Sequence, residues 1–193
     1  MLGELLTKYI YLPIILWLVF WSLNRFLTIY SLGEYKKAKG ENLQVAGSGE
    51  LNDPSVSDIE KGKYISPLFV IVGLAGVLLI LIMWFFIRSV NLPVEVLELT
   101  IGFILFQEIH AVISNLGSAV NSVYLAKKKG IKGKILYERW VMQRMIAATF
   151  FGFSALYLFN FALSNSFYFL GGMLSTAVLA IRFLSMAKKN QKN

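Results

Sequence analysis

Long apolar runs separated by shorter polar segments dominate the pattern of the chain. A helix that crosses a bilayer needs about 20 apolar residues, because the hydrocarbon layer is about 30 Å thick and a helix rises 1.5 Å per residue. Five runs meet this requirement, at residues 9–30, 65–88, 94–126, 140–163 and 167–186. The pattern therefore predicts an all-α integral membrane protein, with one transmembrane domain over residues 1–193 built as a bundle of about five helices.

Two parts of this pattern depart from a simple series of spans. The third run, residues 94–126, is 33 residues long and would form about 50 Å of helix, so it must tilt strongly or leave the bilayer at its end. Residues 31–64 between the first two runs are polar and include a stretch rich in Gly, Ser and Asp at 47–54. Few of these residues could bury anything, so we expect a mobile polar loop there, with a short interfacial helix before it as a further option.

The basic residues predict an orientation. Residues 31–64, residues 127–139 and the C-terminal tail are rich in Lys, whereas the connections at 89–93 and 164–166 contain neither Lys nor Arg. With five spans, the three Lys-rich segments fall on one side of the membrane, and the positive-inside rule assigns that side to the cytoplasm. The N-terminus is then outside and the C-terminus inside, as expected for a multi-pass protein of the cell membrane.

Composition and charge narrow the possible partners. The chain is 56% hydrophobic and 16% charged, with a formal net charge of +8 and a mean hydropathy of +0.62. In a soluble protein such a charge would suggest nucleic acid. Here the cations flank apolar runs, so we expect a lipid bilayer with anionic head groups as the partner, and no nucleic acid. The lysines expected to contact head groups are Lys127, Lys128, Lys129, Lys132 and Lys134.

The third run carries most of the polar residues inside the predicted spans. The candidates for a ligand or ion path are Gln107, Glu108, His110, Ser114, Asn115, Ser118 and Asn121. At 100° per residue most of them share one face, while Glu108 and Asn115 form an adjacent stripe and Glu108 lies about 200° from His110. Glu108 is expected near the midplane, where an ionisable side chain costs about 3 kcal/mol and must face the bundle or water, or stay protonated.

Packing is an alternative explanation for these residues. Ser114, Ser118 and Ser122 form a ladder of small side chains, which lets helices approach closely, and residues 172, 176 and 180 form a matching ladder on the last run. One histidine and one carboxylate are too few for a metal site, and the absence of cysteine excludes thiolate ligands. The sequence therefore predicts no metal and no cofactor.

Three functions remain compatible with the sequence. We expect a small transporter or channel-like bundle with a polar path along the third run, acting without enzymatic chemistry. The alternative is a structural or accessory subunit that packs into a larger membrane complex or a homo-oligomer. A further alternative is a membrane-embedded enzyme that acts on a lipid, with Glu108 or His110 as the acid or base.

Overall fold

Five long helices make up most of the protein. The computed structural model describes residues 2–38, 43–45, 58–59, 61–128 and 135–191. Its helices are α1 (Leu2–Lys8), α2 (Tyr11–Ala38), α4 (Pro67–Ser89), α5 (Val94–Lys128), α6 (Arg139–Ser164) and α7 (Phe167–Asn190). All except α1 are long and apolar enough to cross a membrane, which confirms the prediction of a five-span, multi-pass protein.

Two helices extend beyond the predicted spans. The prediction that the polar loop begins at residue 31 is wrong, because α2 continues to Ala38. Residues such as Glu34 and Ala38 favour helix, and polarity alone does not end a helix. The third long helix, α5, has 35 residues and is therefore about 52 Å long. The stretch at 47–54 that was predicted to be mobile lies outside the described residues.

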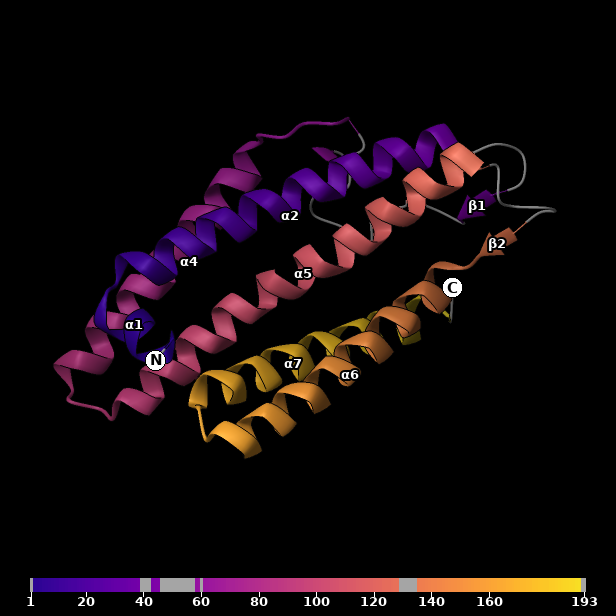
Figure 1. Cartoon of the computed structure of the whole chain (residues 1–193). Coiled ribbons are helices and arrows are strands. Elements are labelled where there is room, and N and C mark those ends of the chain that lie inside the picture. The colour runs from indigo at the N-terminus through magenta and orange to yellow at the C-terminus, as the bar shows by residue number, and fades with distance from the viewer. Residues whose placement is uncertain (1, 39–42, 46–57, 60, 129–134, 192–193) are drawn as a thin grey trace.

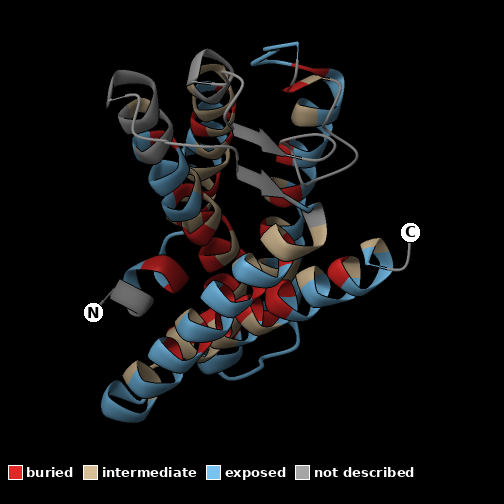
Figure 2. Cartoon of the chain, turned by 90° about the vertical axis from the view of Figure 1, so that its right-hand side faces the viewer, coloured by how far each residue is buried: buried red, intermediate tan, exposed pale blue. Residues whose placement is uncertain are grey.

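The helix α5 is the centre of the bundle. It packs along α2 on one side and along α7 on another, while α6 packs along α7 and α4 makes smaller contacts with α2 and α5. Figure 1 shows α2, α5 and α7 ending, and α6 beginning, at one end of the bundle, which we call the basic end. The connections between α4 and α5 and between α6 and α7 lie at the other end. Buried residues gather where the helices cross, and exposed residues cover the outside (Figure 2).

Glycines allow α5 and α7 to touch through their backbones. A Cβ atom on Gly102 of α5 would collide with the carbonyl oxygen of Tyr168, and one on Gly171 of α7 would collide with that of Leu99. The ring of Phe106 lies against Gly172, one position further along α7. Such close approach is typical of membrane helices with small residues at their interface. It fixes the distance between the two helices near the end where α6 and α7 are joined.

The two expected ladders of small residues do not meet. Gly172, Thr176 and Ala180 are buried, as a packing ladder requires. Their partners are Phe106 of α5 and, through a hydrogen bond of 2.7 Å between the hydroxyls of Thr176 and Ser154, the helix α6. Ser114 and Ser118 of α5 are instead exposed, because α5 and the α6–α7 pair diverge toward the basic end (Figure 1). The side chain of Ser122 lies outside the described residues.

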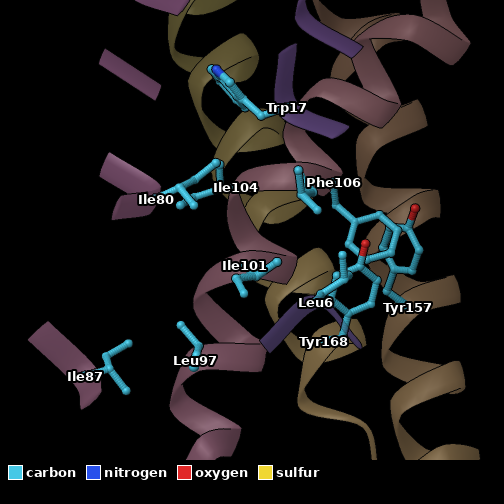
Figure 3. Close-up of a cluster of buried hydrophobic side chains, with 11 residues drawn as sticks. Leu6, Trp17, Ile80, Ile87, Leu97, Ile101, Ile104, Phe106, Tyr157 and Tyr168 are labelled. Carbon is cyan, nitrogen blue, oxygen red and sulfur yellow. The ribbon is translucent and has the colours of Figure 1, made fainter. Parts of the chain in front are cut away.

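Aromatic side chains attach the outer elements to the bundle. Trp17 and Trp21 of α2 stack on each other, and their ring N–H groups donate to the carbonyl oxygens of Gly73 (3.0 Å) and Phe69 (3.2 Å) of α4. At the opposite end from the basic segments, Leu6 of α1 is buried in the same hydrophobic cluster as Phe106, Tyr157 and Tyr168 (Figure 3). The half of the bundle away from the basic end is therefore an apolar, closed core.

A short pairing of strands joins two of the polar segments. Strand β1 (Leu43–Val45) pairs in parallel with β2 (Ile135–Tyr137), so that residue 43 lies opposite residue 135. The hydropathy pattern does not predict this pairing. Because both strands lie outside the candidate spans, the membrane-crossing part of the described chain remains helical.

Candidate functional site

The carboxylate of Glu108 is buried between α2 and α5. Its side chain is only 6% exposed, and the amide Nδ2 of Asn24 donates a hydrogen bond of 2.9 Å to its Oε2 atom. Within the described part of the chain, no Lys or Arg forms an ion pair with this carboxylate. A neutral amide from a neighbouring helix, rather than a cation, therefore holds the acidic group.

Two further side chains extend this contact into a network. Nδ2 of Asn115 donates to Oδ1 of Asn24 at 2.6 Å and to Oγ1 of Thr28 at 2.8 Å. The Thr28 hydroxyl donates in turn to the main-chain oxygen of Asn24 at 2.8 Å. Asn24 and Thr28 lie four positions apart on α2, so they occupy one face of that helix. Glu108 and Asn115 lie seven positions apart on α5 and likewise share one face. We call Asn24, Thr28, Glu108 and Asn115 the Glu108 cluster.

The cluster lies closer to the basic end than the sequence suggested. Glu108 follows Val94 by 14 positions, about 21 Å of helix, whereas α4 with its 23 residues spans about 34 Å. Arg25, the neighbour of Asn24, donates to the carbonyl oxygen of Lys63 at 2.7 Å and lies over the ring of Phe69, where α4 begins. The carboxylate is therefore past the middle of the span, on the basic side.

The surroundings of the cluster differ on its two sides. Toward the end with the α4–α5 connection, the same helix faces carry Trp17, Ile104 and Leu105, all buried and apolar. Toward the basic end, α2 continues with Ser31, one turn beyond Thr28 and only half-buried. The polar seam between α2 and α5 is thus closed by apolar side chains on one side and is followed by one half-buried polar residue, Ser31, on the other.

His110 lies on the opposite side of α5. It is completely buried, and its ring is surrounded by Phe153, Tyr157, Phe150 and Phe106, with ring centroids 4.1, 5.2, 6.1 and 6.4 Å away, respectively. Neither ring nitrogen has a hydrogen-bond partner within the described residues. The expectation that Glu108 and His110 face different neighbours is confirmed, because one contacts α2 and the other contacts α6.

Replacement of His110 by Phe is expected to stabilise the bundle. A buried polar group without a partner costs about 1–3 kcal/mol, and Phe has a similar shape and suits an aromatic environment. We expect His110→Phe to raise the free energy of unfolding by about 1–2 kcal/mol, measured by denaturant titration in detergent. His110→Ala, which leaves a cavity, should lower it by about 3 kcal/mol. If Phe is as damaging as Ala, the imidazole nitrogens make an important interaction that the described residues do not supply.

The other predicted site residues whose side chains the structure describes do not join the cluster. Ser114 and Ser118 are exposed, and the Ser118 hydroxyl donates to the carbonyl oxygen of Ser114 in its own helix at 3.1 Å. Gln107 is half-buried. The side chain of Asn121 and the expected head-group contacts of Lys127, Lys128, Lys129, Lys132 and Lys134 lie outside the described residues. Of the six candidates whose side chains are described, the structure brings together Glu108 and Asn115.

The structure adds to the site two residues, Asn24 and Thr28, that were not among the candidates predicted from the sequence. Their signal in the sequence was a polar pair one helical turn apart in the first span. That signal was weak, because Asn24 and Arg25 lie near the end of the predicted span, where polar side chains are common. Only knowledge of which face of α2 meets α5 could have assigned them to Glu108.

Comparisons with known proteins supply no relative: no family model, no curated protein and no solved structure matches the chain. Among the described residues, no group of three or more His, Cys, Asp or Glu side chains could hold a metal ion. The function must therefore be argued from the Glu108 cluster and its surroundings.

Proposed function

We propose that the chain is a small transporter that moves an ion along α5 by way of the Glu108 cluster. The observation that carries this proposal is the buried carboxylate of Glu108, which lacks a cationic partner within the described residues. An ionisable residue within a membrane span is costly, and such residues mark ion pathways and proton relays in many membrane proteins. Three hydrogen bonds of the cluster join α2 to α5, and a fourth, from the Thr28 hydroxyl to the main-chain oxygen of Asn24, lies within α2.

The uneven surroundings of the cluster favour a carrier over a permanent pore. Thr28, Ser31 and Asn115 provide polar groups between Glu108 and the basic end, whereas Trp17 and Leu105 close the other side. An ion that enters from the basic end would reach the carboxylate and stop. Its release on the other side requires a change in the packing of α2 against α5, as expected for alternating access.

Ion flux across proteoliposomes tests this function. Reconstituted protein should transport H⁺, Na⁺ or K⁺, followed by ion-sensitive dyes under a defined membrane potential, faster than protein-free vesicles. Glu108→Gln should reduce the flux to the background of the vesicles. Glu95→Gln, which removes an exposed carboxylate from the first turn of the same helix, is the matched control and should retain it. Absence of flux for all three ions would contradict the proposal.

We also propose that the basic end faces the cytoplasm of the cell membrane, with the N-terminus outside and the C-terminus inside. The support is the Lys-rich composition of the segments that leave this end, since basic loops are enriched on the cytoplasmic side. A tag on each terminus, probed with an impermeant reagent on intact cells, should react only at the N-terminus. Reaction at the C-terminus would reverse the orientation.

A second candidate function is that of a subunit in a larger membrane assembly. The specific observation is the exposed face formed by Ser114, Gly117 and Ser118 of α5. Among the described residues, no atom beyond the neighbouring backbone of α5 lies within 4 Å of a Cβ placed on Gly117. Small residues on an uncovered helix face favour packing against another helix. Gentle extraction followed by mass spectrometry should then reveal a stoichiometric partner or a second copy. A stable, active monomer would contradict this alternative.

A further inference from the structure

We infer that the short helix α1 is a releasable latch, which keeps α2 against α5 at the end of the bundle opposite the basic end. We call this opposite end the far end. The inference rests on the proposed transport function, because it names the contact that must be released before an ion can leave on the far side. It is carried by the position of α1 and by the two contacts that hold it there.

The helix α1 lies over the far end of α5, next to the start of α2 (Figure 1). Residues 9–10 separate α1 from α2, so the chain changes direction between the two helices. The side chain of Leu6 is 2% exposed and lies in the hydrophobic cluster with Phe106, Tyr157 and Tyr168 (Figure 3). These three rings come from α5, α6 and α7. The beginning of α2 is therefore tethered, through Leu6, to a cluster built by the other side of the bundle.

A main-chain oxygen of α1 forms the second contact, with α4. The carbonyl oxygen of Thr7 accepts a hydrogen bond of 2.8 Å from Arg88 and one of 3.2 Å from the ring N–H of Trp84. The guanidinium of Arg88 also lies over the Trp84 ring, 4.1 Å from its centroid. Carbonyl groups in the last turn of a helix lack partners within that helix, and a cation is favourable there. The last turns of α4 therefore hold the end of α1 in place.

The seam that this latch would keep closed leads to Glu108. Ile101 lies seven positions before Glu108 on α5, so the two side chains share one face of the helix. Leu97, one turn before Ile101, continues this face toward the far end. Leu97 is 3% exposed and Ile101 is 2% exposed. At Glu108 the same face contacts α2, through the hydrogen bond from Asn24. Passage from the far end to Glu108 therefore requires α2 to move away from this face.

The two contacts of α1 oppose that movement. Trp17 and Trp21 bond α2 to the main chain of α4, so α2 and α4 would move away from α5 together. The helix α1 is joined to α2 through the chain and to α4 through the Thr7 carbonyl. Leu6, in contrast, is buried in the cluster that includes Phe106 of α5. The seam can therefore open at the far end only after Leu6 has left this cluster.

Few side chains hold α1, as a releasable element requires. Among its described side chains, Leu6 and Thr7 are buried, whereas Leu5 and Lys8 are exposed. Segments with few buried contacts open at a lower free-energy cost than the core of a protein. The two residues at 9–10 between α1 and α2 can act as a hinge, since hinges are short segments at the ends of helices that absorb changes in backbone angles.

The reaction of an introduced cysteine with a charged, membrane-impermeant thiol reagent tests the latch. The reporter is Ile101→Cys in the purified full-length protein, held in nanodiscs so that the reagent reaches both faces. The sequence contains no cysteine, so the label reports on this position alone. Leu6→Ser should raise the labelling rate about 10-fold, because the rate follows the population of the open state and α1 loses its buried apolar side chain.

A second variant tests the other contact of the latch. Arg88→Met leaves α1 unchanged but removes a donor to the Thr7 carbonyl, and should raise the labelling rate at Ile101→Cys about 5-fold. Leu5→Ser is the matched control, because it introduces the same residue into α1 at a side chain that is 43% exposed. It should leave the rate unchanged. Leu179→Cys, a second reporter in the buried cluster of α6 and α7, should not respond to any of these variants.

The possible outcomes separate the latch from the transport function. Faster labelling at Ile101→Cys in both latch variants, with Leu5→Ser and the Leu179→Cys reporter unaffected, supports the latch. Unchanged labelling in both variants overturns it, and so does equal acceleration at the two reporters, which indicates general loosening of the bundle. Faster labelling without flux of any ion keeps the latch and removes the transport function. Flux that depends on Glu108 but is unchanged in both latch variants supports transport and overturns the latch.

Discussion

Gly171→Leu is expected to disrupt the packing of α5 against α7 and to lower the free energy of unfolding by about 3 kcal/mol. A Cβ atom at this position would collide with the carbonyl oxygen of Leu99 and would lie 2.6 Å from the amide nitrogen of Phe103. Both are backbone atoms, so no side chain can rotate away to make room. The two helices would have to separate, which would expose the apolar core around Phe106 and Tyr168. Denaturant titration of the protein in detergent measures this loss.

A glycine with free space around it provides the control. Gly152 of α6 is exposed, and in the described part of the chain no atom beyond the neighbouring backbone of α6 lies within 4 Å of a Cβ placed on it. Gly152→Ala should therefore leave the stability unchanged or raise it by up to about 1 kcal/mol, because Ala favours helix more than Gly. If Gly171→Leu is as stable as Gly152→Ala, the close contact between α5 and α7 is not part of the native fold.

Asn24→Leu is expected to cost about 3 kcal/mol of stability. The substitution removes the amide that donates to Glu108 and leaves the buried carboxylate without this hydrogen bond. When one partner of a buried polar pair is removed, the loss in the free energy of unfolding exceeds the contribution of the intact pair, because the remaining group stays desolvated without a hydrogen bond. The double variant Asn24→Leu/Glu108→Leu should recover most of the loss, since both polar groups are then replaced by apolar ones.

A double-mutant cycle with the two single variants and the double variant measures this coupling. Asn160→Leu is a suitable control, because the Asn160 side chain donates to the carbonyl oxygen of Leu156 in its own helix, at 2.8 Å, and lies in an exposed part of α6. It should change the stability by less than about 1 kcal/mol. A loss in the double variant equal to the sum of the losses in the two single variants would show that Asn24 and Glu108 are not energetically coupled.

The five spans could be predicted from the sequence because bilayer thickness sets a minimum length for an apolar helix. The ends of the helices could not. The helix α2 extends eight residues beyond its predicted end at Tyr30, since hydropathy reports the boundary of the apolar layer and not the boundary of the helix. The contact between Gly102 and Gly171 was also missed, because a glycine inside an apolar run does not indicate which helix will lie against it.

Part of the candidate site was visible in the sequence. Glu108 was identified because charged residues are rare within spans, and its separation from His110 followed from the helical period. The partners of each residue depend on which helix faces meet, and one sequence does not contain that information. Asn24 therefore became a site residue only through the packing of α2 on α5. Ser114 and Ser118 became exposed because α6 and α7 diverge from α5.

The parallel pairing of β1 and β2 has a consequence for the order of assembly. Residues 43 and 135 are 92 positions apart (135 − 43), and both α4 and α5 lie between them in the chain. Contacts between residues so distant in sequence form slowly, because the entropy of closing the intervening loop must be overcome before any hydrogen bond is gained. Two strands of three residues gain little free energy from their hydrogen bonds. We therefore expect them to pair only after α4 and α5 have entered the membrane and packed. The pairing is thus expected to be one of the last contacts to form as the chain matures.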